Sequence, residues 1–384
     1  MGKEYQLGTY YFPNYHIDKM NEAWHGTGWN EWALMKTATP RFQGHQQPRV
    51  PEWGYQNEAD PEVMAQKIDA AAEAGLDAFI FDWYWYKEGK FLSGALEDGF
   101  LKAKNNDKLH FALMWANHLW GSGHPVSRIP EANPVLTSMG ETPEELQQNF
   151  HEATEYIIET YFAHPSYWKV DGKLYFSIYD FTQLKDTFGG VAGVKAAMED
   201  LRERVRRRGL GELHLNMVIK ARPILPGEEG MNDDPDEIAA IGFDSTTSYC
   251  WLHYEPTPHF PAEPYPAYRD ACISKIGELA ERYGRDYIPN ITVGWDPSPR
   301  TVQSDVFEET VYPFCPILVD NTPAEFQKGL EQVKRYLDEH TPKRKMCIFY
   351  AWNEWTEGGY LEPDTVYGDG YLKAIRNVFG GRTE

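Results

Sequence analysis

The sequence has 384 residues, a length that accommodates one large domain or two ordinary ones. Acidic residues number 58 and basic residues 37, so the formal net charge is −21, which disfavours nucleic acids and anionic membrane surfaces as partners. Hydrophobic residues make up 42% of the chain, too many for a disordered protein, and no apolar run has the length of a membrane span.

The cysteines are scattered and form no C-x-x-C pair, so they indicate neither a disulfide framework nor a zinc knuckle. The N-terminus, MGKEYQLGTYYF, lacks the basic and then apolar pattern of a secretory signal. We therefore expect a cytoplasmic protein, or a secreted or periplasmic one whose leader is absent from this sequence.

Short apolar runs alternate with longer amphipathic stretches along the chain. Several of these runs are almost wholly apolar and rich in β-branched or aromatic residues, as is typical of strands covered on both faces. In chain order the predicted strands are Leu7–Phe12, Ala78–Trp83, Phe111–Trp115, Lys173–Ile178, Leu213–Ile219, Ser245–Tyr249, Tyr287–Val293 and Lys345–Tyr350.

Helical patterns lie between these strands, and capping residues mark their ends. Each of three predicted helices begins with a capping residue followed by proline at the first helical position: Asp60-Pro61, Thr142-Pro143 and Thr322-Pro323. The first of them stops at Gly75. A further helix is predicted over 193–208, where the three final arginines suit the negative end of the helix dipole.

Eight strands that alternate with helical or loop segments predict an α/β protein, a single (β/α)8 TIM barrel with long βα loops over residues 1–384. An open doubly wound sheet is the competing fold. However, no G-x-G-x-x-G follows the first strand and no G-x-x-x-x-G-K-[ST] occurs, which disfavours dinucleotide and P-loop functions.

Aromatic and polar residues concentrate after nearly every predicted strand, at the end where barrel enzymes place their chemistry. Flat aromatic faces with polar groups between them suit a carbohydrate, whose C–H faces stack on rings and whose hydroxyls need hydrogen-bond partners. The candidate substrate-binding residues are Tyr11, His16, His25, Trp29, Glu31, Asp82, Trp83, Trp115, Asn117, His118, Tyr249, Trp251, Trp295, Asn353 and Trp355. Core packing is the competing interpretation for the aromatic residues of this set.

The segment Asn353-Glu354-Trp355-Thr356-Glu357-Gly358 carries the sharpest signal. Glycosidic cleavage needs one carboxyl group to protonate the leaving oxygen and a second to act near the anomeric carbon. Tryptophan neighbours would desolvate a carboxyl group and raise its pKa, as an acid catalyst requires. We therefore predict Glu354 and Glu357 as the catalytic pair. Two solvated carboxylates on a surface loop are the alternative.

The remaining polar candidates each have a structural alternative. Glu31 would bind a sugar hydroxyl or pair with a nearby histidine, and Asp82 would contact substrate or be a hydrogen-bonded aspartate at the barrel rim. His118 is separated from His16 and His25 by a whole barrel unit and no H-E-x-x-H occurs, so no metal site is predicted.

Three stretches resemble the WbsX family, which is similar to glycoside hydrolase family 99, the endo-α-mannosidases and endo-α-mannanases. They are YFPNYH with WHGTGWNEW and FQGHQQPR near the N-terminus, GLDAF through WYW with a later WAN, and AWNEWTEG with YLEPD near the C-terminus. The resemblance extends from end to end of the chain. The first-strand region follows the WbsX pattern more closely than the mannosidase pattern, which leaves the sugar open.

The resemblance implies a retaining glycoside hydrolase acting on an oligo- or polysaccharide, without a metal or organic cofactor. It implies Glu357 as general acid/base and Glu354 as the group that assists attack by the substrate's 2-hydroxyl, through a 1,2-anhydro sugar. A route with one glutamate as nucleophile is the alternative.

Two other functions stay open: a glycosyltransferase of O-antigen or capsule synthesis, and a non-catalytic carbohydrate-binding barrel. Asp233-Asp234-Pro235-Asp236 precedes a predicted helix, where capping is a simpler account than a D-x-D metal motif. Oligomeric state is left open.

Overall fold

The computed structural model of the protein describes residues 4–121, 124–129, 133–222, 224, 233–284, 286–340 and 343–380. Its strands are β1 (Gln6–Tyr11), β2 (Ala78–Tyr86), β3 (Gly89–Phe91), β4 (His110–Trp115), β5 (Lys169–Val170), β6 (Lys173–Ile178), β7 (Leu213–Val218), β8 (Ser245–Thr247), β9 (Ala262–Pro264), β10 (Tyr287–Ile288), β11 (Asn290–Thr292), β12 (Ile317–Val319), β13 (Met346–Tyr350), β14 (Asn353–Glu354) and β15 (Gly359–Tyr360).

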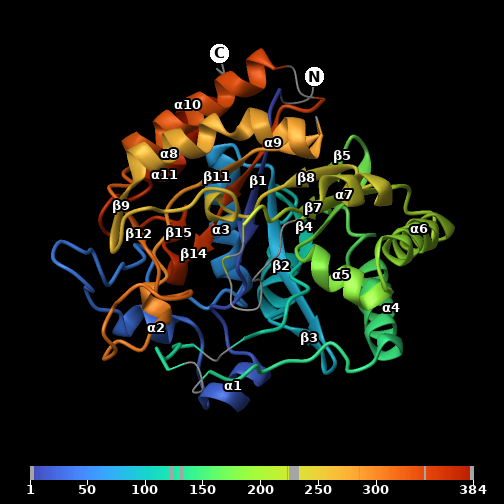
Figure 1. Ribbon diagram of the computed structural model, residues 1–384, viewed down its shortest axis with the longest axis horizontal. Coiled ribbons are helices and arrows are strands. Elements are labelled where there is room, and N and C mark those ends of the chain that lie inside the picture. The colour runs from blue at the N-terminus through green and yellow to red at the C-terminus, as the bar shows by residue number, and fades with distance from the viewer. Residues whose placement is uncertain are drawn as a thin grey trace.

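The α-helices surround these strands (Figure 1). They are α1 (Lys19–His25), α2 (Trp32–Thr37), α3 (Pro61–Ala74), α4 (Pro143–Thr160), α5 (Phe181–Phe188), α6 (Val191–Arg207), α7 (Pro235–Ile241), α8 (Tyr265–Ser274), α9 (Ile276–Tyr283), α10 (Pro323–Glu339) and α11 (Gly370–Phe379). None of the helices in the described part of the chain has the length and apolar character that crossing a bilayer requires.

Nine parallel strands form a nearly closed barrel in the order β10-β8-β7-β6-β4-β2-β1-β13-β11. The two end strands, β10 and β11, follow each other along the chain on either side of Pro289, and they pair with β8 and β13 respectively. The predicted seventh strand is therefore two short strands, because proline has no N–H to donate to the ladder and interrupts it. The other seven predicted strands match β1, β2, β4, β6, β7, β8 and β13 within two residues at each shared end, except that β2 runs on to Tyr86.

The helix ends follow the capping signals. The side chains of Asp60, Thr142 and Thr322 accept hydrogen bonds from backbone N–H groups at the starts of α3, α4 and α10. Gly75 ends α3 in the left-handed conformation, at a φ of 95°. Asp234 caps α7 in the same way as Asp60 caps α3, which confirms the capping role expected for this acidic segment.

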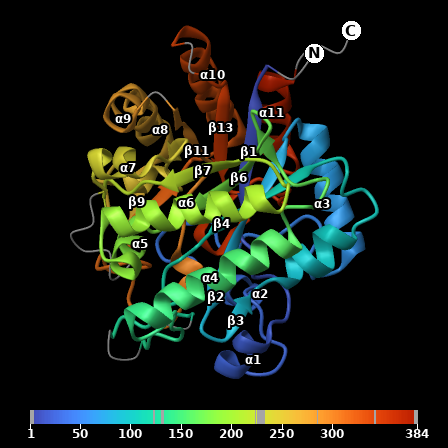
Figure 2. The same cartoon turned by 90° about the vertical axis from the view of Figure 1, so that its right-hand side faces the viewer.

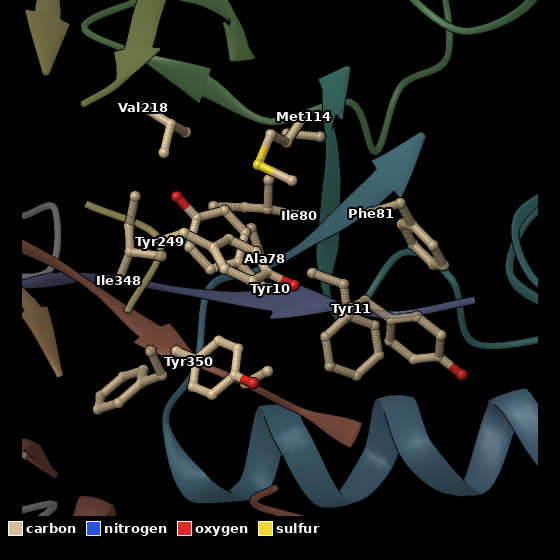
Figure 3. Close-up of a cluster of buried hydrophobic side chains, with 14 of the residues drawn as sticks. Tyr10, Tyr11, Ala78, Ile80, Phe81, Met114, Val218, Tyr249, Ile348 and Tyr350 are labelled. Atoms are coloured by element: carbon tan, nitrogen blue, oxygen red, sulfur yellow. The ribbon is translucent and has the colours of Figure 1, made fainter. Parts of the chain in front are cut away.

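Alternation along the strands sends neighbouring side chains to opposite faces of the barrel wall. Figure 3 shows Tyr10 of β1 and Ile80 of β2 in one cluster with Tyr249, while Tyr11 and Phe81 lie nearer a neighbouring helix. The rings of Tyr10 and Tyr249 have centroids 4.6 Å apart, and those of Tyr11 and Phe81 likewise. Tyr10 and Tyr249 thus pack against each other within the barrel.

The loops that follow β1 and β2 lie together at one end of the molecule, where they carry α1, α2 and β3 (Figure 2). The carboxyl ends of all nine barrel strands share one end of the barrel because the strands are parallel. The long βα loops predicted from the sequence therefore converge there and provide the walls of a cavity.

Candidate active site

The Asn353–Tyr360 segment forms a small hairpin directly after β13. β14 and β15 pair antiparallel, with a short 3₁₀ turn, Trp355–Glu357, between them. Two glycines let this hairpin press against the barrel. A Cβ at Gly358, whose φ is 70°, would lie 2.7 Å from the Cβ of Asp296, and a Cβ at Gly359 would lie 2.3 Å from the ring of Tyr350. The hairpin thereby fixes the backbone that carries Glu354 and Glu357.

One guanidinium binds three buried carboxylates at this place. The Nε of Arg300 lies 2.9 Å from Glu31 Oε1 and its Nη2 lies 3.0 Å from Glu354 Oε2, while its Nη1 donates to Glu357 Oε1. Arginine suits this position because its rigid fork presents five donors. Burial opposes the charge of Arg300, but the acidic neighbours outweigh burial and raise its pKa well above the ordinary value.

Two phenols complete the surroundings of Glu357. Tyr312 donates to Oε1 at 2.5 Å, and Tyr350 donates to Oε2. The hydroxyl of Tyr312 also lies 2.6 Å from Arg300 Nη1. Every oxygen of the Glu357 carboxylate therefore has a donor.

Glu354 has a sparser set of partners. Its Oε2 contacts Arg300, and its Oε1 lies 3.1 Å from the hydroxyl of Tyr249, which in turn lies 2.7 Å from Asp82 Oδ2. Burial raises the pKa of Glu354 well above its ordinary value, and the charge of Glu357 raises it further. Burial likewise raises the pKa of Asp82. Two acids whose pKa values are raised by burial therefore contact one phenol.

Glu31 anchors the arginine from the opposite side. This carboxylate is fully buried, and Arg300, Asn14 and Thr356 surround it, with Thr356 Oγ1 2.5 Å from Oε1. It does not line the cavity. Of the two alternatives for Glu31, the structure places it in a buried ion pair, although the partner is Arg300 and not a histidine.

A second layer of charged groups lies behind the hairpin. Glu58 accepts from the backbone of Tyr15 at 2.7 Å and from the hydroxyl of Tyr11 at 2.8 Å. Lys67, on α3, lies 2.7 Å from Glu362, whose two oxygens accept from the indoles of Trp352 and Trp355. These bonds hold the tryptophans of the motif in the wall and away from the cavity.

The cavity above these groups has a volume of about 550 Å³, within the range of small-molecule sites. Its floor holds Glu354, Glu357, Asp82 and Arg300. The aromatic and histidine side chains among its lining are Phe12, Tyr84, His118, Trp120, His124, Tyr179, Tyr249, His253, Trp295, Tyr312 and Phe314. A mainly apolar wall above a few acids suits the stacking of a sugar ring over reacting carboxyl groups.

The structure brings only part of the predicted substrate-binding set to this cavity: Asp82, His118, Tyr249 and Trp295. The buried Tyr11 and His16 contact Glu58, the half-buried His25 and Trp29 stack on each other, and Asn117 and Asn353 bond backbone groups of Asp180 and Phe12.

Four predicted platforms lie within the wall and not in the cavity lining. Trp83 donates to the hydroxyl of Tyr161, and Trp115 packs against Phe150. Trp251 donates to the carbonyl of Asn290, and Trp355 stacks on Tyr360 at 3.8 Å. For these four tryptophans the structure agrees with the core-packing alternative.

The sequence interpretation did not include Arg300, Tyr312 or Tyr350. Arg300 ends a 3₁₀ turn in the loop after β11, and Tyr312 lies further along the same loop. Only their position in the sequence could have pointed to Arg300 and Tyr312, because both follow the seventh predicted strand, at the end of the barrel where the other site residues lie. Tyr350 is the last residue of β13 and carried the same signal. Across the described residues, no group of three or more His, Cys, Asp or Glu side chains is arranged to hold a metal ion.

Comparison with known proteins supports both the family and the fold. The family model described as "Glycosyltransferase WbsX" matches residues 7–375. An uncharacterized protein, WxcX, from Xanthomonas campestris pv. campestris strain B100 is 27% identical over 393 residues, which cover 97% of this chain and 49% of that protein. The chain therefore spans about half the length of the curated relatives it matches.

Among solved structures, the chain is similar to a GH99 endo-α-mannosidase from Bacteroides thetaiotaomicron, with a TM-score of 0.51 and 15% identity over 97% of this chain and 96% of that one. A glycoside hydrolase-like protein gives a TM-score of 0.57 and 16% identity over 98% and 94% of the two chains. These likenesses confirm the (β/α)8 fold.

Proposed function

The chain belongs to the WbsX family, and from this premise and the two acids in its cavity we propose that it is a retaining glycoside hydrolase that cleaves a glycosidic bond in an oligo- or polysaccharide. The observation that carries the proposal is the convergence of Glu354 and Glu357 on one guanidinium, on the floor of an aromatic-walled cavity. Two fixed carboxyl groups beside a sugar-sized space are what acetal cleavage requires.

In this proposal Glu357 is the general acid/base at the leaving group. A general acid must first hold a proton, and Tyr312 and Tyr350 can accept a hydrogen bond from the protonated acid as well as donate to the carboxylate, since a phenol does both. Once the proton has left, Arg300 and the phenols stabilise the carboxylate.

Glu354 assists attack by the substrate's 2-hydroxyl and gives a 1,2-anhydro sugar, or attacks the anomeric carbon itself. Its raised pKa supports the first role, because a carboxylate of raised pKa is a stronger base when ionised. A 2-deoxy-2-fluoro glycosyl donor separates the two routes. The covalent route leaves a sugar ester on Glu354 that mass spectrometry detects, and the anhydro route, which needs the 2-hydroxyl, leaves none.

Incubation with a panel of oligosaccharides, polysaccharides and aryl glycosides tests the function, with NMR identifying the first-formed anomer. We expect retention of configuration and a loss of about 10³-fold or more in kcat for Glu357→Gln. The exposed Glu52→Gln is the matched control and keeps full activity. Full activity of Glu357→Gln would remove the proposal.

Glycosyl transfer is the second candidate, and the description of the family model favours it. A transferase would turn over only when a nucleotide- or lipid-linked donor is present and would leave free glycans intact. The same panel with and without such donors therefore distinguishes the two functions. Binding without turnover under either condition would instead indicate a carbohydrate-binding protein.

A further inference from the structure

A single phenol lies between two acids at the floor of the cavity. The hydroxyl of Tyr249 is 2.7 Å from Asp82 Oδ2 and 3.1 Å from Glu354 Oε1. All three residues are buried, with Asp82 2% and Glu354 3% exposed. A phenol carries one hydrogen, so it donates to one of these oxygens. The other contact is a hydrogen bond only if the acid itself supplies the hydrogen.

We infer that Asp82 and Glu354 share one proton through Tyr249, so that Asp82 determines whether Glu354 is ionised. In one state Asp82 Oδ2 holds the proton and donates to Tyr249, and Tyr249 donates to Glu354. In the other state Glu354 Oε1 donates to Tyr249, and Tyr249 donates to Asp82. The states interconvert when the acid's proton moves to the phenol oxygen as the phenol's own hydrogen moves to the other acid. One O–H bond breaks and one forms between Tyr249 and Asp82, and likewise between Tyr249 and Glu354, so the phenol stays neutral.

The charges around this relay favour one proton on the pair. Glu357 and Glu31 are acids of the same cluster, and Arg300 is the one cation that the described residues place in contact with Glu354. Tyr10, Tyr15, Tyr84 and Tyr350 also interact electrostatically with one or both of the two acids. Four ionised carboxyl groups against one guanidinium would be costly in a buried site, and a shared proton removes one negative charge.

Asp82 has a further oxygen that no group in the described residues bonds. Its Oδ1 is buried and has no hydrogen-bond partner, and Asp82 lines the cavity. A hydroxyl of a bound sugar that donates to Oδ1 would stabilise the Asp82 carboxylate and move the shared proton towards Glu354. This coupling of occupancy to protonation rests on the proposed function, whereas the shared proton does not.

Infrared spectroscopy of the protein without substrate tests the shared proton, because a protonated carboxyl group has a C=O stretching band that a carboxylate lacks. We expect this band in the wild type at about pH 8, where Asp233, whose pKa burial raises to about 6, is ionised. The band should persist in Glu357→Gln, which removes any proton that the proposed general acid holds. In that background Asp82→Asn and Glu354→Gln should each abolish the band, since an amide can bond the phenol without the extra proton. If the two acids were protonated independently, each substitution would remove only the band of the substituted acid and leave the band of the other acid. That result would overturn the inference.

The matched controls are Asp186→Asn and Glu281→Gln, both at exposed positions, and they should leave the band unchanged. In Tyr249→Phe the acid that keeps the proton has lost its phenol partner, so the band should move to higher frequency. An unmoved band in this variant would also overturn the inference. Because no substrate is present, a protein that hydrolyses no glycan can still show the expected pattern, and the two proposals fail separately.

Discussion

At the scale of single residues, Arg300 is the cation that three buried acids of the site share. It contacts Glu31, Glu354 and Glu357, which reach it from two ends of the chain, and all four side chains are buried. Removing one partner of a buried ion pair leaves uncompensated charge, which costs far more than the loss of an exposed pair. Arg300 therefore has a positioning role for both proposed catalytic acids and a role in stability.

We predict that Arg300→Met lowers the free energy of unfolding by about 3–5 kcal/mol, because it leaves the carboxylates without their cation. Urea denaturation followed by circular dichroism measures the change. Arg207→Met is the control, since Arg207 is exposed and its ion pair within the described part of the chain is with Glu203 on its own helix. This substitution should change stability by less than about 0.5 kcal/mol. Equal effects of the two substitutions would contradict the role assigned to Arg300.

The raised pKa of Glu354 gives a pH-dependent prediction. A carboxyl group whose pKa is higher in the folded than in the unfolded state binds its proton more tightly when folded. Its contribution to stability is present below the unfolded pKa and is lost as the pH rises through the folded pKa. The Tm of Glu354→Gln should therefore rise relative to that of the wild type between about pH 5 and pH 8. Calorimetry at both values measures the gap, and a constant gap would show that Glu354 titrates normally.

At the scale of elements, the hairpin after β13 depends on close backbone contact. Gly358 has a positive φ and lies against Asp296, which itself accepts hydrogen bonds from His45 and Gln47 at 2.7 Å. The loops after β1, β11 and β13 thus meet at Asp296. A side chain there would push the preceding residue, Glu357, away from Arg300 and the phenols.

Gly358→Ala should lower kcat by about 10-fold or more and cost about 1–3 kcal/mol of stability, since it adds backbone strain to a steric clash. Steady-state kinetics on a glycan found in the screen and urea denaturation provide the measurements. Gly209→Ala is the matched control: its φ is 71°, but a Cβ there meets nothing within 4 Å. Identical losses in both variants would show that backbone strain alone matters and that the contact with Asp296 does not.

At the scale of the whole molecule, the charge of −21 and the acidic cavity floor act together on any charged ligand. Like charges repel over distances comparable with the Debye length, and added salt screens that repulsion. The negative charge of the protein does not repel a neutral glycan, whereas it repels a glycan rich in uronic acids.

We expect kcat/KM for a uronate-containing glycan to rise as NaCl is increased from about 0.05 to 0.5 M. The value for a neutral glycan of the same linkage should stay constant and is the internal control. A uronate-containing glycan that is preferred at low salt would contradict this prediction and would point to a basic subsite in the loops.

The sequence predicted the barrel well because its strands and caps are local signals. Buried β-branched runs and residues such as Asp60 and Thr322 depend on neighbours a few positions away. The site was harder to predict because its contacts are not local. Arg300 meets Glu31 across 269 positions, and nothing in either segment indicates the other. Trp251 and Trp355 resemble platforms in sequence, but each indole N–H finds an internal acceptor, so burial carries no penalty.

The guanidinium that joins Glu31 to Glu354 and Glu357 also sets an order of events during synthesis. Glu31 leaves the ribosome before Arg300, and Arg300 leaves before Glu354 and Glu357. A nascent polypeptide thus has one acid without its cation until Arg300 is made, and Arg300 then lacks two of its three acids until the segment after β13 is made. Premature termination anywhere before the last barrel strand would release a polypeptide with an unbalanced interior, which cellular proteases can recognise and remove before it binds any glycan.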